Sequence, residues 1–157
     1  PYYAYSRDEG NTWSDAMMIA PPIGLVGTGF PVVTAGSEGR VAFGYVGDIG
    51  NQTWHGYMTI LTDAFSDNPL FTTVQINQPD DPLDSSDAYP EGCGYERCGG
   101  LGDFLDMGVD QYGRPWFSLA NNDAGEIGIF ATITDGPTLR GDLGQLNPMP
   151  LGGTLTL

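Results

Sequence analysis

Ser6-Arg7-Asp8-Glu9-Gly10-Asn11-Thr12-Trp13 is the stretch from which the fold of this chain is predicted. It reads S-x-D-x-G-x-T-W, with short polar side chains placed around a glycine. Ser6 and Asp8 can accept hydrogen bonds from the backbone of a tight turn, and the glycine can adopt a positive φ that other residues resist. We expect Thr12 and Trp13 to resume a strand, with the indole covering the hairpin. The stretch therefore predicts a tight turn between two β-strands.

The composition favours short strands over helices. The chain has 157 residues, enough for one ordinary domain core, and contains 24 Gly, 12 Pro and eight Tyr without an obvious amphipathic helix. It has no apolar run of about 18 residues, so we expect no insertion into a membrane. We expect an all-β fold.

The charge excludes two classes of partner. Twenty acidic residues face five arginines and no lysine, which gives a net charge of -15. Nucleic acid and anionic lipid require a basic patch, so neither is expected as a ligand. The carboxylates form a solvated acidic surface, or some of them bind calcium.

The two cysteines, Cys93 and Cys98, are too few for a structural zinc site, since the chain has only one histidine to add. A short disulfide between them would indicate an oxidising, extracellular compartment. Two free thiols in a cytosolic protein are the alternative.

The chain also repeats. Segments 29–45 and 103–119 are each predicted as a β-hairpin, and their Gly-Arg pairs are offset by 74 residues (39 to 113). A third strand follows each hairpin and ends near Asp63 or Asp135. Such a repeat suits the four-stranded blades of a propeller.

The stretch at 6–13 resembles the Asp-box, the repeat that marks sialidase-like β-propellers, and the resemblance covers about residues 1–140. It implies an all-β fold, a partial β-propeller of sialidase type with about two and a half four-stranded blades. In that family the box lies at a turn away from the active site, so it implies the architecture and leaves the activity open. The residues of the box that are expected to have this structural role are Ser6, Asp8, Gly10, Thr12 and Trp13. Cys93 and Cys98 are also expected to be structural, through the short disulfide suggested above.

We interpret residues 1–157 as a single propeller segment. Its parts are the end of one blade (1–20), a complete blade (28–77), an acidic loop that contains the cysteines (78–102), a third blade (103–140) and a tail (141–157). Closed propellers have about 4–8 blades. The remaining blades are therefore expected on the same longer chain, or the ring is closed by other copies or chains.

Ligand-binding residues are expected where the loops after the second strands meet the links between blades. In sialidase-like proteins this face holds the ligand, and here the resemblance implies binding by Arg97, Asp48 and Asp123. The long link 77–102 is either a rigid flap over the gap between blades or part of the site.

Sialidase chemistry, as the resemblance implies it, needs a Tyr nucleophile, a Glu that activates it, an Asp as acid/base and three arginines. The weak catalytic candidates are Tyr95, Glu96 and Asp103. The family's first arginine lies in an F/Y-R-I-P motif, but in Thr28-Gly29-Phe30-Pro31 this position holds Gly29. Sialidase or other glycoside hydrolase activity is therefore expected only if missing blades supply the arginines.

No cofactor is expected except possible Ca²⁺. Its weak candidate ligands are Asp80, Asp81, Asp84 and Asp87, which offer oxygen atoms but lack the frame of an EF-hand loop. A solvated acidic loop is the alternative. The favoured function is a secreted or cell-surface propeller that binds or processes glycans through its loop-rich face. The alternative is a non-catalytic structural or protein-interaction module of an extracellular assembly.

Overall fold

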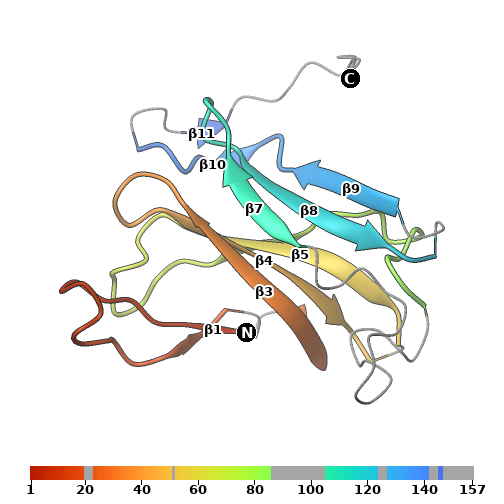
Figure 1. Cartoon of the computed structure of the whole chain (residues 1–157), viewed down its shortest axis with the longest axis horizontal. Coiled ribbons are helices and arrows are strands. Elements are labelled where there is room, and N and C mark those ends of the chain that lie inside the picture. Colours follow the sequence, from red (N-terminus) through yellow and green to blue (C-terminus); the bar gives the residue numbers. More distant parts are fainter. Residues whose placement is uncertain (20–22, 51, 86–104, 124–126, 142–144, 147–157) are drawn as a thin grey trace.

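The computed structural model describes residues 1–19, 23–50, 52–85, 105–123, 127–141 and 145–146. That part of the chain contains eleven strands in four antiparallel sheets and almost no helix. The prediction of an all-β fold is confirmed (Figure 1). Among the described strands, no sheet closes on itself.

The largest sheet has four strands in chain order. They are β3 (Gly27–Ala35), β4 (Val41–Asp48), β5 (Trp54–Leu61) and β6 (Thr72–Gln75). Each strand pairs with the next in antiparallel register, as hairpin connections require. The sheet occupies the segment in which a four-stranded unit was expected, 28–77.

A second sheet repeats this order with three strands: β7 (Asp106–Val109), β8 (Pro115–Asn121) and β9 (Ile127–Thr132). The predicted offset of 74 residues therefore separates equivalent positions of two observed β-hairpins, β3–β4 and β7–β8. The chain continues into a short pair, β10 (Gly136–Pro137) and β11 (Gln145–Leu146).

The N-terminal pair consists of β1 (Tyr2–Tyr3) and β2 (Met17–Met18). The strand after the turn begins at Met17, so the prediction that Thr12 and Trp13 resume it was wrong. The reason is local, because the Thr12 amide donates to the Asp8 carboxylate at 2.8 Å and cannot join a ladder. The Trp13 indole likewise turns back and donates to the Gly10 carbonyl at 3.1 Å.

The turn at 6–13 is held by side-chain acceptors. The Ser6 hydroxyl accepts from the Gly10 amide at 2.8 Å, and Gly10 has a φ of +88°. The Asp8 carboxylate accepts from the amide and the hydroxyl of Thr12, and these bonds, with one from Ser6, lower the pKa of Asp8. Ionised Asp8 therefore stabilises the turn.

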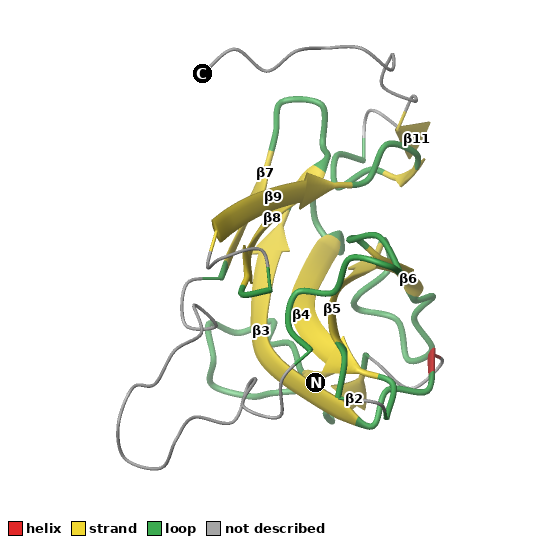
Figure 2. Cartoon of the chain, turned by 90° about the vertical axis from the view of Figure 1, so that its right-hand side faces the viewer, coloured by secondary structure: helices red, strands yellow, loops and turns green. Residues whose placement is uncertain are grey.

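The sheets stack with the four-stranded sheet in the middle (Figure 2). All eight residues of β5 are buried, because β1 and β2 cover one face of the sheet and β7–β9 cover the other. The first interface contains Tyr3, Phe43, Tyr45 and Tyr57. Tyr45 and Tyr57 stack with ring centroids 6.0 Å apart.

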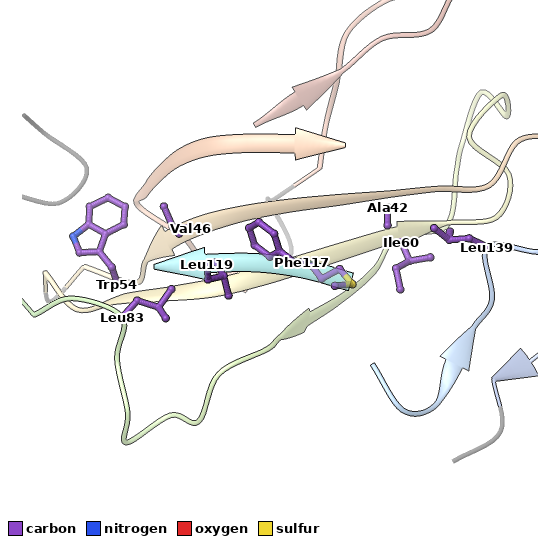
Figure 3. Packing of buried hydrophobic residues seen from close by; sticks show 9 residues of the cluster. Ala42, Val46, Trp54, Ile60, Leu83, Phe117, Leu119 and Leu139 are labelled. Atoms are coloured by element: carbon purple, nitrogen blue, oxygen red, sulfur yellow. The ribbon is translucent and has the colours of Figure 1, made fainter. Parts of the chain in front are cut away.

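The second interface interlocks small residues with large ones. Phe117 and Leu119 project from β8 toward the four-stranded sheet and lie among the core side chains labelled in Figure 3. A Cβ atom added at Gly44 would lie 2.9 Å from the Phe117 ring, and one added at Gly56 would lie 2.9 Å from Leu119 Cδ1. The glycines therefore let the two sheets approach closely.

Candidate functional site at the loop end

The stacked sheets have two ends, because neighbouring strands run in opposite directions. We call the end with turns 6–13, 36–40, 62–71 and 110–114 the turn end. Its turns are bonded across the sheets: the Tyr3 hydroxyl donates to the Ala64 carbonyl, and the Ala64 amide donates to the Gly39 carbonyl. This end is thus a fixed row of turns.

Residues 138–141 extend that row to the β7–β9 sheet. The Leu139 amide donates to the Gly113 carbonyl at 2.9 Å, and its carbonyl accepts from the Ser37 amide at 2.8 Å. Arg40 Nη1 donates to the Thr138 carbonyl at 2.6 Å. Sequence reasoning missed this connection, since these residues have no strand periodicity. The only signal was glycine at positions 36 and 113, where an added Cβ would overlap the Leu139 carbonyl and the Thr138 hydroxyl respectively.

We call the opposite end the loop end. Its described residues are 48–50 and 52–53 at the end of β4, 76–85 after β6 and 121–123 at the end of β8. The Trp54 amide donates to the Asp84 carbonyl at 2.8 Å, and the Leu83 amide donates to the Trp54 carbonyl at 2.9 Å. The Asn122 amide donates to the Leu83 carbonyl at 2.7 Å. The start of β5, residues 83–84 and Asn122, which are distant in sequence, are therefore hydrogen-bonded to one another at the loop end.

Side chains strengthen the same junction. Asn122 Nδ2 donates to Asp84 Oδ2 at 2.7 Å, and Asp84 is buried. The Ser85 hydroxyl donates to Asp123 Oδ2 at 2.6 Å, and both of these residues are exposed. Asp123, a predicted ligand-binding residue, therefore lies on the rim of the loop end. Ser85 was not among the residues predicted for this face, and its hydrogen bond to Asp123, 38 positions away in the sequence, is what places it there.

Asp48, the second predicted ligand-binding residue, is buried. Its Oδ1 atom accepts from the Gly50 amide at 2.9 Å, and its carbonyl accepts from the Val26 amide. The carboxylate thus holds the turn after β4, and no ligand needs to be invoked for it.

His55 lies beneath this surface and is also buried. Its Nδ1 atom is 3.0 Å from Asn77 Nδ2 and 3.2 Å from Gln75 Nε2. Burial lowers the pKa of His55, against smaller opposing effects from the Asn77 hydrogen bond and the Asp48 charge. Neutral His55 can accept the amide proton at Nδ1, which is the bonding that the two neighbours require. We infer a structural role for His55.

The two ends differ in charge. Every arginine in the described residues belongs to the turn end: Arg7, Arg40, Arg114 and Arg140. The turn end also carries six carboxylates: Asp8, Glu9, Glu38, Asp63, Asp67 and Asp110. The described part of the loop end has five carboxylates and no arginine; Asp48 and Asp84 are buried, and Asp80, Asp81 and Asp123 are exposed. A surface with this charge repels anionic ligands and attracts cations or hydroxyl groups.

The side chains of Arg7, Arg40 and Arg114 make contacts within the turn end. Arg7 lies over the Phe65 ring, 4.4 Å from its centroid. Arg114 Nη1 is 3.8 Å from Asp110 Oδ2. Burial acts to raise the pKa of Asp110, but hydrogen bonds from Arg114, Trp116 and Tyr112 and the Arg114 charge outweigh it and lower the pKa.

Gly29, which stands where the family has its first arginine, lies in an irregular part of β3. The register with β4 shifts between Gly29 and Val32, and Phe30 has a φ of +49°. Gly29 offers no side chain, so this strand cannot bind a carboxylate in the manner of an arginine.

The calcium candidates in the described residues do not converge. Asp80 and Asp81 are exposed on a turn, whereas the Asp84 carboxylate is bonded to Asn122. In the described ranges there is no group of three or more His, Cys, Asp or Glu side chains that could hold a metal ion. Several predicted residues lie outside the described part of the chain: Asp87, Cys93, Tyr95, Glu96, Arg97, Cys98 and Asp103.

Comparison with protein-family models, curated proteins and solved structures found no match to this chain. Within the residues that the structure describes, no helix is long and apolar enough to cross a membrane.

Proposed function

We propose that this chain is a segment of a sialidase-like β-propeller that binds uncharged glycans at its loop end, in a secreted or cell-surface protein. The observation that carries the proposal is the hydrogen bonding of two separate loops, at 76–85 and 121–123, to each other and to Trp54 at the start of β5, at one end of stacked antiparallel sheets. Binding sites are commonly built from such loops on a rigid scaffold.

The Asp-box resemblance of 6–13 and the repeated sheets support the propeller part of the proposal. Asp8 and Asp63 each accept a backbone amide in the turn between two paired strands, from Thr12 between β1 and β2 and from Leu70 between β5 and β6. Repetition of one supersecondary unit, each packed on its neighbour, is the organisation of propellers.

The charge of the loop end supports an uncharged ligand. Exposed carboxylates such as Asp80 and Asp123 can accept hydrogen bonds from sugar hydroxyls, whereas they repel the carboxylate of a sialic acid. Gly29 in place of an arginine works in the same direction. We therefore propose binding, and hydrolysis only if blades outside this segment supply catalytic groups.

The test is a binding titration of the native full-length polypeptide with neutral and with sialylated oligosaccharides. We expect neutral oligosaccharides to bind, and Asp123→Ala to weaken binding by about tenfold or more, as for the loss of a charge-assisted hydrogen bond. Asp67→Ala is the matched control, since Asp67 is an exposed aspartate of the turn end. Equal effects of the two substitutions, or preference for the sialylated ligand, would contradict the proposal.

A second candidate function, a non-catalytic module of a larger assembly, is favoured by a different observation. Phe130 of β9 is 76% exposed, on the face of the β7–β9 sheet that is turned away from the four-stranded sheet. Large apolar side chains exposed on a sheet face are typical of surfaces that pack on another body.

A further inference from the structure

The face of the β7–β9 sheet that is turned away from β3–β6 is equivalent to the face of β3–β6 that packs on β7–β9. Ile129 and Ala131 of β9 pack against the core, so the alternate residues Gly128 and Phe130 lie on the other face. Gly108 of β7 lies on that face too, since Met107 and Val109 pack against the core. Among the described residues, a Cβ atom added at Gly108 or Gly128 would meet nothing within 4 Å.

The ladders show which residues of the two sheets are equivalent. Val46 pairs with Gly56 in the four-stranded sheet, and 74 residues later Ala120 pairs with Gly128. Gly128 therefore stands where Gly56 stands in the preceding sheet.

Phe130 stands at the ladder position that Met58 occupies in the preceding sheet. Gly44 pairs with Met58, and 74 residues after Gly44, Ser118 pairs with Phe130. Met58 is completely buried by the β7–β9 sheet, whereas Phe130 at the equivalent ladder position is 76% exposed. The two sheets thus have the same face, which is covered in one and exposed at Gly108, Gly128 and Phe130 in the other; we call the latter the open face.

The covered face of β3–β6 shows which side chains pack on a face of this kind. Phe117 and Leu119, two residues apart on β8, fill the space above Gly44 and Gly56. The small residues Ser118 and Gly128 stand at the equivalent positions of the open face. The face is therefore shaped for large apolar side chains at alternate positions of one strand.

We propose that the open face of β7–β9 docks a further antiparallel sheet of the same polypeptide, whose second strand presents two large apolar side chains to Ser118 and Gly128. The partner thus has the build of β7–β9 itself, and the interface continues the one already present between β3–β6 and β7–β9. This inference rests on the proposed propeller architecture, but it does not depend on glycan binding.

The test is the melting temperature of the native full-length polypeptide carrying Gly128→Leu. A leucine at an uncovered strand position leaves the melting temperature unchanged or raises it, since glycine weakens a strand. In a covered interface it overpacks, and we expect a fall of about 4 °C or more. Gly56→Leu is the positive control, because its side chain would collide with Leu119 and Ile76.

Phe130→Lys supplies a second reading that does not depend on overpacking. It should lower the melting temperature by several degrees if Phe130 is covered, and the matched variant Leu70→Lys should not, since Leu70 is 71% exposed on the turn end. Unchanged melting temperatures for both Gly128→Leu and Phe130→Lys would overturn the proposal. Falls that depend on protein concentration would overturn it too, because they would assign the face to a second copy. A fall without glycan binding would leave this inference standing and refute only the glycan ligand.

Discussion

Replacing Gly44 with alanine should weaken the packing of the four-stranded sheet on β7–β9. The added Cβ would lie 2.9 Å from three carbon atoms of the Phe117 ring. Unstrained carbon contacts are about 3.5–4.0 Å. Phe117 is completely buried, so its ring cannot move away without displacing neighbours.

The expected magnitude follows from two opposing effects. Overpacking a dense core costs about 1–3 kcal/mol. Replacing glycine by alanine stabilises by about 0.4–1 kcal/mol, because it restricts the unfolded chain. The overpacking is the larger effect, so Gly44→Ala should lower the free energy of unfolding by about 1–2 kcal/mol.

Urea unfolding of the native polypeptide, with and without Phe117→Leu, measures this effect and its origin. Leucine lacks the ring atoms that meet the new Cβ, so the two substitutions should be coupled by about 0.5 kcal/mol or more in a double-mutant cycle. If Gly44→Ala stabilises the protein, or if the two changes are simply additive, the proposed interlock of glycine and phenylalanine is refuted.

Three further predictions concern the two ends. Gly36→Ala should destabilise more than Gly44→Ala, by about 3 kcal/mol or more in urea unfolding, because its Cβ would overlap the backbone carbonyl of Leu139 and not a side chain; an equal or smaller loss would argue against that close contact. Asp84→Ala should cost about 1–3 kcal/mol, since it leaves the Asn122 amide without the carboxylate it bonds, and a neutral result would show that the loops at 83–85 and 121–123 are not coupled. The folded-state pKa of His55 is lowered, so the stability due to its neutral form is present above about pH 6.5 and is lost as the pH falls through the lowered value. His55→Gln should therefore reduce the loss of unfolding free energy between about pH 7 and pH 5, and an unchanged slope would contradict this assignment.

The sequence by itself determined the kind of secondary structure and its repetition. Alternating apolar residues around glycine turns predict hairpins, and the Gly-Arg pairs at 39 and 113 do mark equivalent β-turns, because turn geometry and strand alternation are local properties. The same locality explains the hydrogen bonds within 6–13, where acceptor, glycine and donor are all within eight residues. The wrong prediction of a strand at Trp13 has a local cause as well. The Trp13 indole donates to the Gly10 carbonyl, and this bond competes with strand formation within a few residues, where a sequence pattern does not distinguish the two.

The tertiary structure decided which residues meet. Asp84 was a candidate calcium ligand in the sequence, but its contact with Asn122 across 38 positions shows that it holds two loops together. Asp48 was predicted to bind a ligand, yet packing buries it and commits it to a turn. The burial of Met58 and the exposure of Phe130, at equivalent ladder positions, likewise depend on whether another sheet covers the face. Contacts between sheets are set by packing among segments distant in sequence, and no local pattern carries that information.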